Sequence, residues 1–452
     1  MNARIALCAA FAAVFLSACG DTPDDPVNGS LRFVHAAASQ GGTDFLLEER
    51  SQGTLNYAGA STVTSIDAGP YDLHLETLVS SAAAPVRSIS FVGNIEAETE
   101  HTYVLYDDNG SLSITEYTAP QAVIEGTNVE VRMLNAVVGS GALDFYLEAE
   151  GTDLSAATPR ASITFKEISP PFTVTSGVYR LSITEAGNAA AVLFESAQFT
   201  ANDATATIMA AFAGAGQSTA AIRASSLVRG NSTPLALIDS RTQSELRVIN
   251  AALTAGPLDV VVDGDFANPL HAAIAPGTTT GLAALTTGDR QIQVTPAGNM
   301  GVIESDLTIS VSPAVNRTQL LAGTDGAITS NIYADDNRGF AARARYRVRH
   351  GASSFSAVDF YLHEPGVAIT DASPQARGLQ VTGSELVAAA LPDDYEISIV
   401  LNDGDLATTD TTVIAGPLPV TFDESRVYEI VLFDNATQDG IDISVTDVTF
   451  VP

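Results

Sequence analysis

Three side chains that could do chemistry recur four times along the sequence at one fixed spacing. In each copy an arginine is followed three residues later by His or Asn and twelve residues later by Asp. A cation, an imidazole and a carboxylate could together bind an anion or move a proton. The four sets are Arg32, His35 and Asp44; Arg132, Asn135 and Asp144; Arg247, Asn250 and Asp259; and Arg347, His350 and Asp359. We call these twelve residues the repeat signature.

The exchange of His for Asn between copies favours a structural role for the repeat signature. Both side chains can donate and accept hydrogen bonds and so close a loop, whereas Asn cannot replace His as a proton shuttle. The Arg and the Asp would lie on consecutive strands joined by a short loop, where a hydrogen-bonded pair would fix the register of the hairpin. We therefore predict no catalytic residues, and a site repeated in every copy is the alternative.

The spacing of the signature arginines predicts four domains. These arginines lie 100, 115 and 100 residues apart, which is the length of a small domain. Around them, short runs of alternating apolar and polar residues are separated by turn residues, as in an antiparallel sandwich. The alanine-rich run 208–213 favours a helix by composition, but its place in the repeat predicts a strand.

The N-terminus predicts export and a lipid anchor. Arg4 precedes the apolar run 5–15, which is too short for a good spanning helix. Residues 16–19, Leu-Ser-Ala-Cys, resemble the bacterial lipoprotein box, and the resemblance implies that Cys19 becomes the acylated first residue. Because Gly20 is not the aspartate that holds many lipoproteins at the inner membrane, the outer membrane is favoured. The alternative is an ordinary secretory signal that ends in Cys by chance.

The expected boundaries follow polar, turn-rich connections between the copies. A lipoprotein signal peptide is expected at 1–18 and a polar tether at 19–30. The four sandwiches are expected at 31–118, 128–228, 245–336 and 343–452.

Composition argues against several classes of function. The net charge of −32, with Lys166 as the only lysine, argues against a nucleic acid partner and against binding to anionic lipid headgroups. Cys8 lies inside the signal peptide, so the processed chain would have no thiol for disulfides, catalysis or a cysteine-ligated metal. The sequence lacks a Gly-x-Ser-x-Gly elbow, a His-Glu-x-x-His zinc helix and a phosphate loop. We therefore predict no enzyme, no cofactor and no metal, with a hydrolase as the remaining alternative.

Three weaker features could bind a ligand. Acidic residues on one face of a predicted strand could hold a metal, and acidic turns offer oxygen ligands for calcium, although without the spacing of an EF-hand. Alternating arginines in copy four could bind an acidic polysaccharide, but pairing with nearby Asp and Glu is the simpler interpretation. These features are Asp72, His74 and Glu76; the turns 107–110, 263–265 and 403–405; and Arg343, Arg345, Arg347 and Arg349.

The opening strands of copies one and four resemble the start of a known family. Residues 31–36 read Leu-Arg-Phe-Val-His-Ala and residues 346–351 read Tyr-Arg-Val-Arg-His-Gly, and an Asp-aromatic pair follows within 43–45 and 358–360. This pattern is similar to that of domain of unknown function 4397. Copies two and three depart from it with Asn in place of His, and copy three has Arg290 where a Tyr is expected. The resemblance implies an exported bacterial module, often in tandem, with an immunoglobulin-like sandwich and no assigned activity.

Together these features predict an all-β chain of four tandem immunoglobulin-like antiparallel β-sandwich domains in an elongated array. As function we expect a non-catalytic, lipid-anchored protein of the bacterial cell envelope that acts as a spacer, adhesion or protein-interaction module. Its partners would be the membrane, through the N-terminal lipid, and a surface protein or a glycan. The alternative is an extracytoplasmic protein that binds an acidic glycan or calcium.

Overall fold

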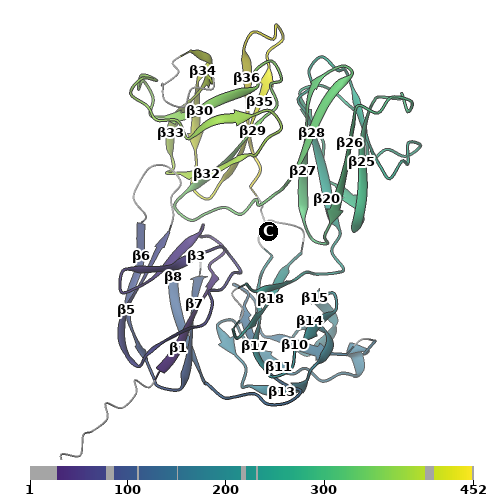
Figure 1. Ribbon diagram of the computed structural model, residues 1–452. Coiled ribbons are helices and arrows are strands. Elements are labelled where there is room, and N and C mark those ends of the chain that lie inside the picture. The colour runs from purple at the N-terminus through teal and green to yellow at the C-terminus, as the bar shows by residue number, and fades with distance from the viewer. Residues whose placement is uncertain are drawn as a thin grey trace, which may run out of the picture.

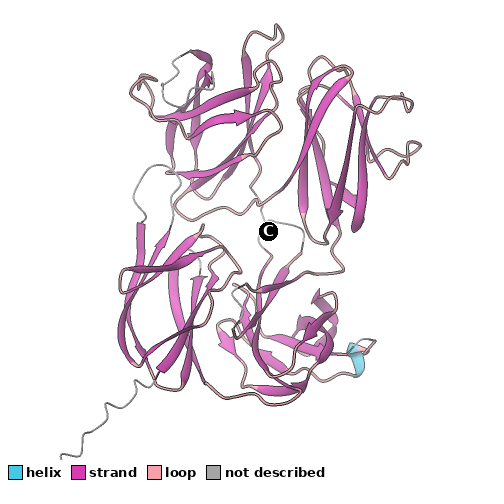
Figure 2. Cartoon of the chain, viewed as in Figure 1, coloured by secondary structure: helices cyan, strands magenta, loops and turns pink. Residues whose placement is uncertain are grey.

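The computed structural model describes residues 28–77, 86–108, 111–149, 151–214, 220–230, 233–402 and 412–449. These residues form strands and connecting loops, with one short 3-10 helix in the described ranges at Leu154–Ala156 (Figure 2). No helix in these ranges is long and apolar enough to cross a membrane. The expected signal peptide, Cys19 and the tether up to residue 27 lie outside the described residues. Asn28–Ser30, expected in the tether, begin the first strand instead.

The strands form four sandwiches of two sheets each, coloured purple-blue, teal, green and yellow-green in Figure 1. In the first and fourth sandwiches the first sheet has the strand order four-one-seven-eight and the second sheet has the order three-two-five-six. The second and third sandwiches follow the same plan with the fourth strand divided into two short strands that both pair with the first, and the second sandwich has two further short strands at its edges. In the numbering of the undivided plan, the first and seventh strands run parallel, and all other described pairs are antiparallel. The predicted all-β fold of tandem β-sandwiches is confirmed. Its strand order differs from the four-plus-three order of an immunoglobulin constant domain.

The first two sandwiches contain strands β1 to β19. The first has β1 (Asn28–Ala36), β2 (Thr43–Leu47), β3 (Arg50–Leu55), β4 (Thr64–Asp67), β5 (Gly69–Thr77), β6 (Val86–Ile95), β7 (Thr99–Asp108) and β8 (Ser111–Pro120). The second has β9 (Asn128–Ala136), β10 (Leu143–Glu148), β11 (Ala161–Ile163), β12 (Glu167–Ile168), β13 (Phe172–Thr175), β14 (Gly177–Glu185), β15 (Asn188–Glu195), β16 (Phe199–Ala201), β17 (Thr205–Ala213), β18 (Ile222–Val228) and β19 (Leu235–Leu237). The alanine-rich run 208–213 lies in β17, so the predicted strand is confirmed.

The last two sandwiches repeat the same plan. The third has β20 (Ser244–Asn250), β21 (Leu258–Val262), β22 (His271–Ile274), β23 (Thr278–Thr279), β24 (Ala283–Leu285), β25 (Gly288–Pro296), β26 (Ser305–Val311), β27 (Asn316–Thr324) and β28 (Ala327–Ala334). The fourth has β29 (Ala344–His350), β30 (Ala357–His363), β31 (Ala376–Gln380), β32 (Leu386–Ala390), β33 (Asp393–Leu401), β34 (Val413–Phe422), β35 (Val427–Asp434) and β36 (Ile441–Asp447).

Each sandwich buries its own apolar core between its two sheets. In the first sandwich, Phe33 of β1 packs against Phe45 of β2, with their ring centroids 4.7 Å apart. In the fourth, Phe422 stacks on Tyr428 with centroids 4.6 Å apart. Such aromatic pairs add to the stabilisation that burial of their surface provides. Each described sandwich therefore has a packed core of its own.

The first sheet of each sandwich is also buried on its outer face. The side chains of β1 and β7 that point away from their own core pack against the equivalent strands β9 and β17 of the second sandwich. Strands β20 and β27 of the third sandwich pack in the same way against β35 of the fourth. The second sheets keep a solvent-facing side, as the alternating burial along β26 and β34 shows. The sandwiches therefore associate in two pairs through their first sheets.

The two pairs are stacked on one another rather than strung end to end. Figure 1 shows the third and fourth sandwiches above the second and first. The connection between the third and fourth sandwiches contacts the first, where Ala341 N–H donates to the Ser39 carbonyl at 2.8 Å. The expected elongated array is therefore not what the structure shows. An array needs polar outer faces, whereas apolar first-sheet faces gain stability by covering one another.

Two adjacent alanines in β17 lie on opposite faces of the first sheet, so mutations there can test the contact between sandwiches and the core of one sandwich separately. Ala210 is buried against the first sandwich, and Ala211 is buried in the core of the second. We expect Ala210→Glu to weaken the association of the first and second sandwiches by about 3 kcal/mol or more, because it buries an unpaired carboxylate in their interface. The second sandwich should stay folded. Ala211→Glu should unfold the second sandwich. Small-angle scattering and near-ultraviolet circular dichroism measure the two effects, and a parent-like scattering profile for Ala210→Glu would contradict this packing.

Candidate functional site

The structure separates the Arg and the Asp of each repeat signature. In every sandwich the Arg lies on the first strand, in the first sheet, and the Asp lies on the second strand, in the second sheet. The predicted Arg–Asp pair across a hairpin is therefore wrong. The loop between these strands crosses from one sheet to the other, so the two strands are not hydrogen-bonded neighbours. A hairpin loop and a loop that crosses between sheets have the same sequence pattern, a short polar segment after an apolar strand.

The His or Asn of the signature closes this loop through hydrogen bonds to the backbone, as predicted. His35 Nδ1 accepts from the Ala37 N–H at 3.3 Å, and His35 Nε2 donates to the Gly41 carbonyl at 2.9 Å. Asn135 makes the same two bonds with its amide oxygen and nitrogen, at 3.0 and 3.5 Å. Asn250 repeats them at 3.1 and 3.4 Å. The fourth copy keeps the donor bond to a loop carbonyl, at 2.8 Å.

Burial keeps the two signature histidines neutral. It lowers the pKa of His35 to about 4, outweighing the hydrogen bond to Gly41, which acts in the opposite direction. Burial likewise lowers the pKa of His350 to about 4. A neutral ring with its hydrogen on Nε2 fits the donor and acceptor that the loop presents to His35. The environment of these histidines thus suits a structural bond and holds the pKa far from the neutral range in which a general base works.

The signature Asp holds neighbouring loops of the second sheet. Backbone amides and short polar side chains donate to its carboxylate, which is buried in copies two and four and half-buried in copies one and three, and such donors compensate a charge that is removed from water. The donors are Ser51 Oγ to Asp44 at 2.6 Å, Gly187 N to Asp144 at 2.8 Å, Ala273 N and Gly298 N to Asp259 at 2.6 and 2.9 Å, and Gly378 N and Asn402 Nδ2 to Asp359 at 2.8 and 2.6 Å.

The signature Arg of copies one and two joins the first pair of sandwiches. Arg32 is ion-paired with Glu100 and donates from Nη1 to the Leu227 carbonyl of the second sandwich at 2.8 Å. Arg229 of the second sandwich donates to the other oxygen of Glu100 at 2.6 Å. Arg132 donates to the Thr118 carbonyl of the first sandwich at 3.1 Å. Although burial opposes ionisation of Glu100, the two arginines outweigh it and hold its pKa below the usual value.

A larger group of charges, which we call the ionic cluster, lies between the third and fourth sandwiches. Its members are Arg247 of β20, Asp335 after β28, Arg347 and Arg349 of β29, Glu385 before β32 and Glu429 of β35. Glu429 Oε1 accepts from Arg349 at 2.5 Å and from Arg247 at 2.7 Å. Asp335 Oδ1 accepts from Arg349 at 2.9 Å and from Arg347 at 3.1 Å. Arg349 also donates to Glu385 at 2.8 Å.

The ionic cluster is neutral as a whole and largely buried. Three arginines face three carboxylates, and the Arg349 side chain is 0% exposed. Burial opposes ionisation of Asp335, but Arg347, Arg349 and Arg247 outweigh it and keep its pKa below the usual value. Removing one member would leave an uncompensated buried charge, which typically costs about 3–5 kcal/mol. The cluster therefore ties the two sandwiches together and leaves no charge free for a ligand.

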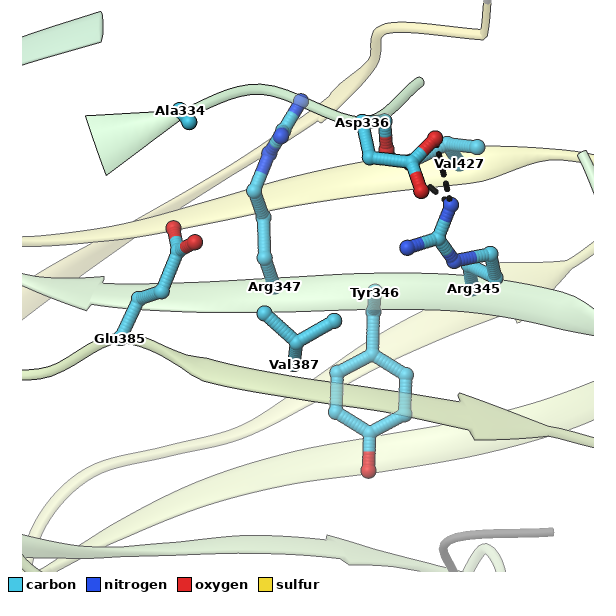
Figure 3. A pocket seen from close by; sticks show the side chains of 8 residues that line it. All are labelled: Ala334, Asp336, Arg345, Tyr346, Arg347, Glu385, Val387 and Val427. Atoms are coloured by element: carbon cyan, nitrogen blue, oxygen red, sulfur yellow. Dashed lines mark hydrogen bonds and ion pairs between the residues drawn. The ribbon is translucent and has the colours of Figure 1, made fainter. Parts of the chain in front are cut away.

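The arginines of copy four are mostly paired within the protein. Arg347 and Arg349 belong to the ionic cluster, and Arg345 pairs with Asp336 at 3.4 Å. Figure 3 shows this pair beside Arg347, where Ala334, Tyr346 and Glu385 line a small pocket. The pocket has a volume of about 140 Å³, which is below the size typical of ligand sites. Pairing with local carboxylates, the simpler interpretation of these arginines, thus describes three of the four.

The metal candidates do not come together in the described part of the chain. No group of three or more His, Cys, Asp or Glu side chains there is arranged to hold a metal ion. His74 instead bonds Ser90 Oγ at 2.9 Å and lies 3.2 Å from a Glu49 oxygen. In the turn 263–265, Asp263 accepts from Arg290 at 2.9 Å, which is ordinary turn chemistry. The turn 403–405 and residues 109–110 lie outside the described residues.

The carboxylates that pair with the signature arginines were not predicted from the sequence. Glu100, Asp335 and Glu429 are each at most 4% exposed. Glu429 stands inside the otherwise apolar run 427–433, and an isolated charge in a buried strand is a signal that a partner charge lies opposite. The isolated charge indicates that a partner of opposite charge exists but does not identify which residue it is.

Comparison with known proteins gives a family and little else. No curated protein matches the chain. Among solved structures, the Bacillus anthracis TIE protein is similar at 9% identity over 90% of this chain and 69% of that one, with a TM-score of 0.15. The Bacteroides ovatus mixed-linkage glucan utilization locus SGBP-B, in complex with a mixed-linkage heptasaccharide, is similar at 11% identity over 86% and 91%, with a TM-score of 0.11. At these TM-scores neither likeness carries an argument about function.

The family match follows the pairing of the sandwiches. The sequence profile named "Domain of unknown function (DUF4397)" matches residues 29–146 and 244–361, together more than half of the chain. Each matched segment begins in the first strand of a sandwich and ends in the second strand of its paired neighbour, and so contains two copies of the repeat signature. The chain therefore belongs to the DUF4397 family, as a tandem array of its domain.

Proposed function

We propose that this protein is a non-catalytic, lipid-anchored component of the bacterial cell envelope that acts as an interaction module. The observation that carries the proposal is the use of the repeat signature. Its histidines and asparagines close loops, its aspartates hold loops, and its arginines join paired sandwiches. Residues that could have formed a site in each copy are thus committed to the architecture.

The packing of the sandwiches favours an interaction module over an extended spacer. A spacer gains length from domains joined end to end, whereas here the first sheets cover one another in pairs. The second sheets remain available on the outside, with regularly exposed positions along strands such as β26. The net charge of −32 keeps such a surface soluble and favours partners that are neutral or basic.

The structural role of the signature histidine predicts a defined response to pH. Because His35 takes up a proton near pH 4 when folded but near 6.5 when unfolded, protonation favours unfolding as the pH falls from 6.5 to 4. The resulting loss in the free energy of unfolding is absent above pH 6.5, grows as the pH falls, and reaches roughly 3 kcal/mol near pH 4. His35→Asn, which introduces the residue of copies two and three, should keep the loop closed and remove this part of the acid sensitivity. Urea unfolding at pH 7 and pH 4.5 measures the difference.

Two controls make the pH experiment decisive. Asn135→His should introduce acid sensitivity into the second sandwich, because the same two loop bonds surround Asn135. His35→Ala should destabilise the first sandwich at both pH values, because it leaves the Ala37 amide without its acceptor. A His35→Asn variant that is stable but has lost a partner or an activity of the protein would contradict the structural role.

The lipid anchor has its own test, because its residues lie outside the described part of the chain. When cells that express the protein are grown with radioactive palmitate, the parent protein should become labelled and the Cys19→Ser variant should not. Cys8→Ser is the matched control, since this cysteine would be removed with the signal peptide and its loss should leave the label unchanged. An unlabelled parent, or equal label in Cys19→Ser, would defeat the proposed anchor while leaving the interaction module open.

A further inference from the structure

A cavity lies where four parts of the chain meet. Its volume is about 530 Å³, within the range of sites for small ligands. The loop 41–42 and Tyr57 of the first sandwich form one wall, and Arg223 of β18 in the second sandwich reaches it from another side. The connection between the third and fourth sandwiches contributes Arg338, and β32 of the fourth forms the remaining wall. The cavity therefore exists only when the two pairs of sandwiches are stacked.

The charged side chains of this cavity have an excess of positive charge. Three arginines line it, Arg223, Arg338 and Arg345, against a single carboxylate, Asp336. Asp336 is fully engaged, because Arg338 donates to it at 2.8 and 2.9 Å and Arg345 approaches it to 3.4 Å. A local charge of two positive units is unusual in a chain whose net charge is −32. An anion that reaches this cavity would find a favourable potential.

Arg223 is the group in this cavity that lacks a partner. Within the described residues its guanidinium has no hydrogen-bond acceptor and no carboxylate within ion-pair distance, although β18 holds it in a partly buried position. Arg338 and Asp336 lie close enough to influence its pKa, which burial lowers. A half-buried cation that stays unpaired costs stability unless a ligand compensates it.

We propose that this cavity binds an acidic sugar through its carboxylate, with Arg223 as the principal donor. The guanidinium fork matches the two oxygens of a carboxylate, and no contact among the described residues uses the side-chain N–H groups of Arg223. Arg345 adds to the charge and donates within the protein only through Nη1 among the described contacts. This inference does not depend on the lipid anchor or on the interaction module.

The remaining walls favour a sugar over a bare anion. The cavity is much larger than a carboxylate group, so it has room for a sugar ring. The exposed Asn56 side chain can bond hydroxyl groups. Val387 and Ala389, on the face of β32 opposite the core residue Ala388, offer an apolar surface for the C–H face of a ring. Charged, polar and apolar groups on different walls are the usual composition of a site for such an amphipathic ligand.

Calorimetric titration of the full-length protein at low ionic strength tests the proposal. The probes are D-glucuronate, neutral D-glucose and acetate. We expect glucuronate to bind, acetate to bind at least about tenfold more weakly, and glucose to show no binding. Arg223→Gln should weaken glucuronate about tenfold or more, since it removes a charge-assisted bidentate contact. Arg180→Gln is the matched control, because Arg180 also lies in the second sandwich but pairs with Glu195 away from the cavity.

A thermal melt of each variant separates lost binding from lost folding. Because Arg223 has no partner in the described structure, Arg223→Gln should melt at or above the parent temperature without ligand. Glucuronate should raise the melting temperature of the parent and of Arg180→Gln, and leave that of Arg223→Gln unchanged. Absence of glucuronate binding, equal binding of acetate and glucuronate, or unchanged affinity in Arg223→Gln would each overturn the proposal.

Discussion

Burial of both faces of the first sheet is the constraint on which the rest of this structure depends. One face packs against the second sheet of the same sandwich, and the other packs against the neighbouring sandwich. Strands buried on both faces read as nearly continuous apolar runs, and any charge within them must find a partner. The signature arginines stand in such runs, so their carboxylate partners follow from the sheet's position. Loop closure by His or Asn then sets where the chain crosses to the second sheet.

The two pairs solve the same packing problem with different chemistry. Thirteen buried residues form the apolar contact between the first and second sandwiches. Six form the apolar contact between the third and fourth, and the ionic cluster forms the rest of that interface. A first-sheet face carrying Arg247 would meet no carboxylate on β17, where Ile208 stands in place of Glu429. An exchange of partners would take Glu429 from Arg247 and leave this arginine only the 3.5 Å ion pair with Asp335 of its own sandwich, and the loss of a buried pair disfavours incorrect pairing.

Local sequence patterns predicted the local structure well and the contacts between domains poorly. The alanine-rich strand β17 and the loop bonds of His35 and Asn135 could be predicted because each depends on neighbours within a few residues or on position in the repeat. The Arg–Asp hairpin pair was wrong because the crossing between sheets has no distinct signal. Arg247 and Glu429 are 182 residues apart, and nothing in either segment specifies the other. The cavity at the junction depends on such distant contacts and could not be predicted.

The pairing of first sheets also bears on how such a chain can grow. The family matches begin at residues 29 and 244, 215 residues apart, and each contains one sandwich and the opening strands of its partner. A chain with an odd number of sandwiches would leave one apolar first-sheet face uncovered and prone to association with other chains. Duplication of a pair adds two faces that cover each other. The chain can therefore lengthen in evolution without passing through a form that exposes an apolar first-sheet face. The unit of inheritance in this architecture is thus the couple of sandwiches, although the single sandwich is the unit that repeats in the sequence.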